Sequence, residues 1–182
     1  MTQHQELSGK KLQYFDHELG EKDANGRPKG ENYIPYVVET SIGCDRMFLA
    51  MISNALQKET VESGGKSRER EVLKLHPALA PVKCAILPLK KNDERLVNLA
   101  KEITRNLSLS FNVQYDDTGS IGKLYARQDA IGTPFSVCVD FEALDDNTVT
   151  IRDRDTLSQE RVAIADLESI IRERVDMKQL FA

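Results

Sequence analysis

Residues 82–87 read Val-Lys-Cys-Ala-Ile-Leu, and this short run decides the fold class of the second part of the chain. A short, largely apolar run of this kind is typical of a buried strand. It follows His76-Pro77 and Ala80-Pro81, and a segment with helical periodicity comes next. A buried strand that leads into a helix begins a strand–helix–strand unit of a parallel sheet.

The following segments alternate between helical and strand patterns. Asn92 can cap a helix whose apolar stripe is Leu96, Ala100, Ile103 and Leu107. The further expected elements are strand 111–115, helix 120–131 ending at Gly132-Thr133-Pro134, strands 135–139 and 148–152 joined by an Asp145-Asp146-Asn147 turn, strand 160–164, and a closing helix with Leu167, Ile170, Ile171 and Val175 inward. The series predicts an α/β fold with a mixed sheet covered by about three helices.

The first 75 residues carry weaker patterns. The first thirty are polar and read as loops around short strands, and residues 33–39 predict a strand that Pro35 places near an edge. Residues 44–56 have apolar side chains on nearly every side, which predicts a helix buried on most faces. The charged segment 57–75, with Gly64-Gly65 at its centre, reads as a linker or mobile insertion. We place a domain boundary near residue 76.

Composition restricts the function classes. The 182 residues carry a net charge of −4, with 11 basic and 12 acidic side chains in residues 1–75 and 14 and 17 in residues 76–182. Binding by counterion release favours an excess of Lys and Arg, so composition alone disfavours nucleic acid. No apolar run approaches the roughly 18 residues of a membrane span, and the first residues do not form a secretory signal, so we expect a cytoplasmic protein without a membrane partner.

The three cysteines predict no metal site. Cys44, Cys84 and Cys138 form no CxxC pair and have no His at ligand spacing. Cys84 and Cys138 lie in apolar stretches, where a small buried hydrophobic side chain is the usual explanation.

The densest group of functional residue types is Glu39-Thr40-Ser41-Ile42-Gly43-Cys44-Asp45-Arg46. Gly43 permits close approach of a ligand, a helix start offers free N–H groups, and Arg46 can stack on a base or contact phosphate. The alternative is an N-cap, a glycine turn and an Asp–Arg ion pair that serve only the fold. The spacing alone leaves both open.

The same stretch, through Glu39, Ser41, Gly43, Asp45 and Arg46, resembles the third signature motif of class II aminoacyl-tRNA synthetases in its glycyl form. Segments 4–16, 33–39, 75–89, 122–134 and 149–155 also resemble the glycyl-tRNA synthetase family, in the same order along the chain. The resemblance implies that residues 1–75 are the end of an antiparallel-sheet catalytic domain, with motif 3 at 39–46. It implies that residues 76–182 are an anticodon-binding domain.

The resemblance also implies an activity, glycine–tRNA ligation, in which ATP attaches glycine to tRNA(Gly) through glycyl-adenylate. It assigns glycine binding to Glu39, Thr40, Ser41, Ile42 and Gly43, and ATP binding to Gly43, Cys44, Asp45 and Arg46. A carboxylate such as Glu39 suits the ammonium of glycine, and a guanidinium such as Arg46 suits the face of adenine. ATP with Mg²⁺, glycine and tRNA(Gly) are the implied ligands, and the intact enzyme is implied to be a homodimer.

The sequence departs from the family in one large respect, because the first two class II motifs have no counterpart here. We therefore expect an excised C-terminal piece that lacks a complete catalytic set, binds no cofactor tightly and is inactive alone. The alternative is a non-catalytic accessory or RNA-binding module that reuses the anticodon-binding fold. Such a module would be expected to have lost Glu39, Ser41 and Arg46, all of which are present.

The candidates for anticodon contact are polar and aromatic groups that can reach unpaired bases. They are Tyr125, Arg127 and Gln128 on one expected helix, and Arg152 and Arg154 at a strand end. Tyr125 can instead be core, and the run from Arg152 to Asp155 can instead be a solvated stretch whose charges neutralise each other. A few local Arg and aromatic groups can read bases without a basic surface. We therefore expect tRNA binding by this chain to be weak and strongly salt-dependent.

Overall fold

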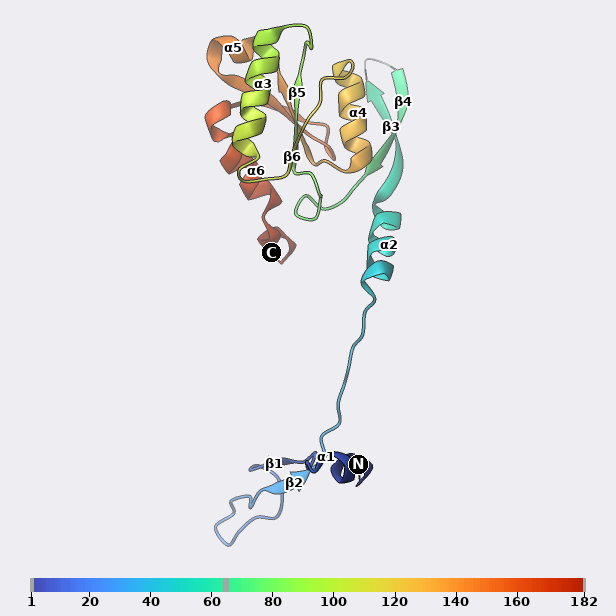
Figure 1. Ribbon diagram of the computed structural model, residues 1–182, viewed down its shortest axis with the longest axis vertical. Helices are drawn as coiled ribbons and strands as arrows, with labels where there is room; N and C mark the ends of the chain where they lie inside the picture. Colours follow the sequence, from blue (N-terminus) through green and yellow to red (C-terminus); the bar gives the residue numbers. More distant parts are fainter. Residues whose placement is uncertain (1, 64–65, 182) are drawn as a thin grey trace. The chain divides into compact units, whose positions relative to one another are not determined.

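The structure is a computed structural model that describes residues 2–63 and 66–181. It contains two compact units, one reaching to Gly43 and the other beginning at Cys44 (Figure 1). Each unit is described by itself. Among the described residues, no helix is both long and apolar enough to cross a membrane.

The first unit is small and open. Helix α1 (Thr2–Ser8) precedes two short antiparallel strands, β1 (Tyr14–Asp16) and β2 (Glu31–Tyr33), whose Tyr14 and Tyr33 rings meet edge to face at 5.9 Å. The sequence patterns did not predict α1. The strand expected over residues 33–39 was largely wrong, because the structure ends it at Tyr33. Pro35 cannot donate to a ladder, and no described strand pairs with residues 34–43.

The second unit is built on a five-stranded sheet, mixed as the alternating patterns predicted, and its strand order is β6-β5-β7-β8-β9. Strand β5 is parallel to both β6 and β7, whereas β8 is antiparallel to β7 and β9. Every residue of β5 and β7 is buried, so these strands form the centre. The bounds are β5 Cys84–Pro88, β6 Val113–Tyr115, β7 Phe135–Val139, β8 Thr148–Asp153 and β9 Gln159–Ala163.

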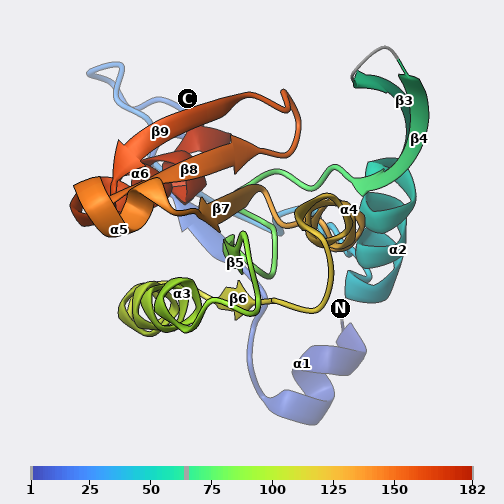
Figure 2. The same cartoon turned by 90° about the horizontal axis from the view of Figure 1, so that it is seen from above.

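Helices cover both faces of this sheet (Figure 2). Helices α3 (Glu94–Leu107), α5 (Glu142–Asp146) and α6 (Leu167–Val175) pack on the face that carries Cys84 and Ile86. Helix α4 (Ile121–Ile131) packs on the opposite face, over Ala85 and Leu87. The predicted α3 stripe is confirmed, since Leu96, Ala100, Ile103 and Leu107 are all buried. Short 3₁₀ turns at Ile164–Asp166 and Met177–Leu180 flank α6.

Two local predictions were wrong. Asp93, not Asn92, caps α3, because its carboxylate accepts the backbone N–H of Arg95. The expected turn at Asp145-Asp146-Asn147 is the end of the short helix α5, and Asn147 closes it in the left-handed conformation. At α3 the neighbouring residue of the same polar class takes the capping role, whereas at α5 the last residue of the predicted turn closes the helix.

The expected linker at 57–75 is also a correction, because most of it is a β-hairpin. Helix α2 (Cys44–Ala55) runs directly into β3 (Leu56–Ser63), which pairs antiparallel with β4 (Lys66–Leu73) from Leu56↔Leu73 to Ser63↔Lys66. The charges that suggested a linker pair across the strands, as in Lys58–Glu71 and Glu59–Arg70. Val72 of β4 is fully buried, and β4 lies beside α4 (Figure 2). The predicted Gly64-Gly65 centre lies outside the described residues.

Helix α2 differs from its prediction as well, since it is largely exposed. Met47, Phe48 and Leu49 have more than half of their surface accessible, and Ala55 is its only buried residue. No described element covers the apolar positions that predicted burial on most faces. The periodicity predicted the helix correctly. The burial prediction was wrong, because apolar content alone does not require a partner within this chain.

The end of α4 lies against the end of β4. Gly132 closes the helix with φ +85°, and a Cβ placed there would lie 3.0 Å from the Leu73 carbonyl oxygen and 3.2 Å from its Cδ2 atom. Only glycine combines this backbone conformation with so close an approach.

We expect Gly132→Ala to lower the free energy of unfolding by about 1–3 kcal/mol, through left-handed strain and the close contact with Leu73. Gly122→Ala is the matched control in the same helix, where an added Cβ meets nothing within 4 Å. It should leave stability unchanged or raise it by up to about 1 kcal/mol. Urea unfolding checks both variants, and equal effects of the two substitutions would contradict this account of the turn.

Candidate functional site

The segment 39–46 is exposed, and it crosses the boundary between the two units. Residues 39–43 have no regular structure, whereas Cys44-Asp45-Arg46 form the first turn of α2. Among the described residues, the side chains of Glu39, Ser41 and Arg46 have no hydrogen-bond or ion-pair partner. The Asp45–Arg46 ion pair of the purely structural alternative is therefore not formed here. The predicted glycine and ATP roles stay predictions.

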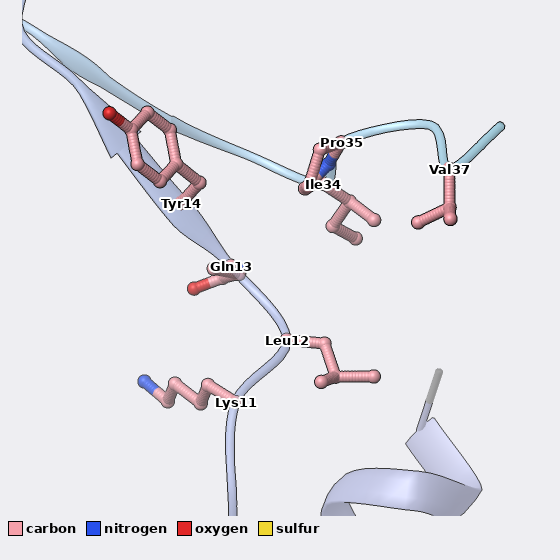
Figure 3. Close-up of a pocket in the computed structure, with 7 residues that line it drawn as sticks. All are labelled: Lys11, Leu12, Gln13, Tyr14, Ile34, Pro35 and Val37. Carbon is pink, nitrogen blue, oxygen red and sulfur yellow. The ribbon is translucent and has the colours of Figure 1, made fainter. Parts of the chain in front are cut away.

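The first unit contains a hollow of about 350 Å³ between β1 and the stretch after β2 (Figure 3). The side chains of Leu12, Ile34 and Val37 point into the same space, while the ammonium of Lys11 points away from it (Figure 3). A substrate pocket combines apolar walls with convergent polar groups. This hollow has apolar walls and does not include Glu39 or Ser41, so it does not define the predicted glycine site.

Arg152, predicted to contact RNA, is an internal residue of the second unit. Its Nη1 and Nη2 atoms donate to the two carboxylate oxygens of Asp129 at 2.9 and 3.0 Å. The guanidinium also lies 4.7 Å from the centre of the Tyr125 ring. A bidentate ion pair combined with a cation–π contact is a strong local arrangement. Arg152 is only 7% exposed, so it supports α4 from within.

Arg154 is buried more deeply, with 1% of its surface exposed. It donates to the carbonyl oxygens of Leu73, Leu75 and Gly132 at 3.1, 2.7 and 2.8 Å. Arg152 and Arg154 fit neither alternative for the run from Arg152 to Asp155. They are neither part of a solvated stretch nor exposed at a strand end where they could contact a base. Alternation in the sequence places both side chains on one strand face, and that face is covered by α4 and β4. We therefore remove both from the RNA-contacting set.

The three candidates on α4 differ in exposure. Gln128 is buried, and its side chain accepts from the Thr133 hydroxyl at 2.7 Å and donates to Gln114 at 3.4 Å. Tyr125 is half-buried against the small core on this face. Arg127 is different, because 47% of its side chain is exposed. Arg127 is the candidate that can reach a ligand without rearrangement.

The guanidinium of Arg127 is held through one of its own nitrogen atoms, Nη2. Its Nη2 donates to the backbone oxygen and the Oγ1 atom of Thr118, both at 3.0 Å, and lies 2.6 Å from Oδ2 of Asp116. Its Nε and Nη1 atoms have no partner among the described residues. Burial opposes ionisation of Asp116, but hydrogen bonds from Thr118 and Arg127 hold its pKa below the usual value. The guanidinium is thus oriented while one edge stays available.

The loop that holds Arg127 follows β6, at the edge of the sheet where the parallel strands β5, β6 and β7 have their carboxyl ends. After β5 the chain passes to α3 on one face, and after the neighbouring strand β6 it passes to α4 on the other (Figure 2). Crevices at the carboxyl ends of such strands are the usual ligand sites of α/β sheets. Exposed Lys90 and Lys91 follow β5 there, and Asp116 and Thr118 follow β6. Sequence reasoning missed these four residues, although their place after two predicted strands was a usable signal.

Comparison with known proteins identifies this sheet and its helices. Residues 83–174 match the anticodon binding domain family. The chain belongs to that family. This membership confirms the fold and the anticodon-binding resemblance, and it outweighs the composition argument against nucleic acid.

Similarity to known proteins extends beyond residues 83–174 into the first unit. It is 49% identical over 162 residues to a glycine–tRNA ligase of Chlorobaculum tepidum, covering 89% of this chain and 31% of the relative. It is 48% identical over 163 residues to the glycine–tRNA ligase of Clostridium perfringens, and 46% identical over 163 residues to that of Agathobacter rectalis. These cover 89% and 90% of this chain and 32% of each relative. The chain therefore spans about a third of the length of these relatives.

We expect Arg152→Met to lower the free energy of unfolding by about 2–4 kcal/mol, because it leaves the buried Asp129 carboxylate with one cation instead of two. Arg127→Gln, on the exposed face of the same region, should cost less than about 1 kcal/mol. Chemical denaturation of the two variants measures both values. A loss for Arg127→Gln as large as that for Arg152→Met would contradict the assignment of internal and surface roles.

Proposed function

We propose that the chain is part of a glycine–tRNA ligase, to which it supplies anticodon recognition and the segment 39–46. The near-half identity with relatives of that name, over about nine-tenths of this chain, carries the proposal. The side chains of Glu39, Ser41 and Arg46, which an accessory module would not need, are present and unengaged. As in the family it resembles, we place the protein in the cytoplasm and the intact enzyme in a homodimer.

The reaction would proceed in two steps. The carboxylate of glycine attacks the α-phosphorus of ATP and pyrophosphate leaves; the terminal hydroxyl of the tRNA then attacks the carbonyl of glycyl-adenylate and AMP leaves. In this proposal Glu39 holds the glycine ammonium, and Arg46 lies on the adenine face. ATP would bring Mg²⁺. Among the described residues, no group of three His, Cys, Asp or Glu side chains could hold a metal ion.

We further propose that RNA meets the second unit at the carboxyl ends of β5 and β6. Arg127 offers two unengaged donor nitrogens to an unstacked base, and Lys90 and Lys91 offer charge to the adjacent phosphates. Orientation by Asp116 and Thr118 lowers the entropy that Arg127 loses on binding. Aspartates near this site offset the positive charge, in keeping with weak, salt-sensitive binding.

Titration of the 182-residue chain with two tRNAs tests this function. One carries the glycine anticodon and the other differs from it only in the anticodon. We expect the first to bind about 10-fold more tightly at low salt, since readout of bases rather than phosphates gives specificity. Equal affinity for both RNAs would contradict the proposal.

Two variants then localise the readout. Arg127→Gln should reduce the preference for the glycine anticodon at least about 3-fold, because a base contact is lost. Lys123→Gln, an exposed residue one turn earlier on α4, should weaken both complexes equally if it acts at all, because it can reach only phosphate. Unchanged preference in Arg127→Gln would move the reading site away from this loop.

A further inference from the structure

A buried chain of charges joins the β3–β4 hairpin to helix α4. Asp129 of α4 is clamped by Arg152, as described above, and also accepts from Nη1 of Arg70 at 3.0 Å. Arg70 of β4 donates in addition to Glu59 of β3 and to the backbone oxygen of Arg154. The side chains of Arg70 and Asp129 are 8% and 4% exposed. One carboxylate on α4 therefore connects two strands that are distant in sequence.

The Arg70–Asp129 contact helps to hold the β3–β4 hairpin against α4. Among the hairpin side chains that the structure describes, Val72 is the only fully buried one, and residues such as Lys58 and Glu71 pair on the outside. Lys74, which follows β4, pairs with Glu59, and hydrogen bonds from Lys74 and then Arg70 hold the pKa of Glu59 below its usual value. With so little apolar burial, docking of the hairpin uses Arg70 and Val72 together with Leu73, whose carbonyl oxygen accepts from Arg154 at 3.1 Å.

The same hairpin is tied to helix α2 at its other end. Strand β3 continues α2 without a break, since Ala55 is followed directly by Leu56. The backbone N–H of Lys74 donates to the Ala55 carbonyl oxygen at 2.7 Å, which satisfies a terminal carbonyl of the helix. Helix α2 begins with Cys44-Asp45-Arg46. Regular elements thus lead from the start of α2 through β3 and β4 (Figure 1). The buried Arg70–Asp129 ion pair joins β4 to α4, the helix that carries Arg127.

We infer that Arg70 and Asp129 are positioning residues, and that their ion pair couples RNA binding at α4 to the docking of the hairpin and the order of α2. This inference rests on the proposed function. The bistable element is the hairpin, docked through the Arg70–Asp129 contact or released from α4. RNA bound at Arg127 restrains α4 and so favours the docked state, and by linkage the docked state favours RNA. Neither residue needs to touch the RNA.

The inferred coupling would connect two sites of the proposed function, the anticodon site at α4 and the ATP segment at the start of α2. The segment assigned to ATP, Cys44-Asp45-Arg46, lies on a helix that runs directly into the hairpin and is bonded to it through the Lys74 N–H and the Ala55 carbonyl oxygen. Occupancy of the anticodon site would therefore be sensed at the start of α2 through Arg70. A purely structural ion pair would stabilise the hairpin equally with and without RNA.

Hydrogen exchange of the 182-residue chain, with and without an RNA stem-loop that carries the glycine anticodon, tests the inference. RNA is added at concentrations that saturate each variant. We expect RNA to slow exchange in α2 and the hairpin at least about 3-fold in the wild type. We expect no such slowing in Arg70→Met, although its RNA affinity stays within about 3-fold because Arg127 is unchanged. Exchange in β5 and β7 verifies that each variant is folded.

Two further variants make the comparison specific. Lys58→Met removes an exposed ion pair from the same hairpin and should keep the full RNA effect, because Lys58 is 76% exposed and pairs with Glu71 of the hairpin itself. Arg70→Lys keeps the charge but loses the planar fork, and it should show an intermediate effect. RNA binding that leaves α2 unchanged in the wild type, or slows it equally in Arg70→Met, would overturn the inference. Absence of RNA binding by the wild type would instead overturn the proposed function, and the binding curve shows which has failed.

Discussion

The carboxylate of Asp129 is the point on which the second unit depends. It is buried, and it accepts three N–H groups from two guanidinium groups, Arg70 of β4 and Arg152 of β8. A buried charge is stable only when its hydrogen-bonding capacity is met, so none of these partners is dispensable. Arg154, which directly follows β8, completes the arrangement by donating to three backbone carbonyl oxygens. Together they fix α4 between the sheet and the hairpin.

This internal use of charge changes what the composition means. Several of the Arg and Asp side chains that a sequence offers for RNA are committed inside the domain, whereas Arg127 and the lysines after β5 are exposed. A nearly neutral domain can then read bases at one loop while the fold uses its other charges internally. That loop lies at the carboxyl end of β6, and its position is set by the strand order rather than by any motif.

Local patterns predicted the sheet well and the periphery poorly. The fully buried strands β5 and β7 and the α3 stripe were predictable because burial on one or both faces leaves a direct signature in the sequence. The β3–β4 hairpin was not, since Arg70 and Glu59 look solvated until a partner 59 residues away is known. The burial of Arg152 and Arg154 depends on the same distant contacts. Only the resemblance to a known family assigned ligand roles to Glu39 and Arg46, and these roles stay predictions. Periodicity alone could not distinguish the segment from a helix cap.

The central claim is that the β3–β4 hairpin and helix α4 form one unit through the Arg70–Asp129 pair. A double-mutant cycle with Arg70→Met and Asp129→Asn, followed by urea unfolding, measures that pair directly. The account predicts a coupling free energy of about 1.5–3 kcal/mol, as expected for contacting residues in one buried network. Additive effects within about 0.5 kcal/mol would show that the two side chains act independently, and would contradict it.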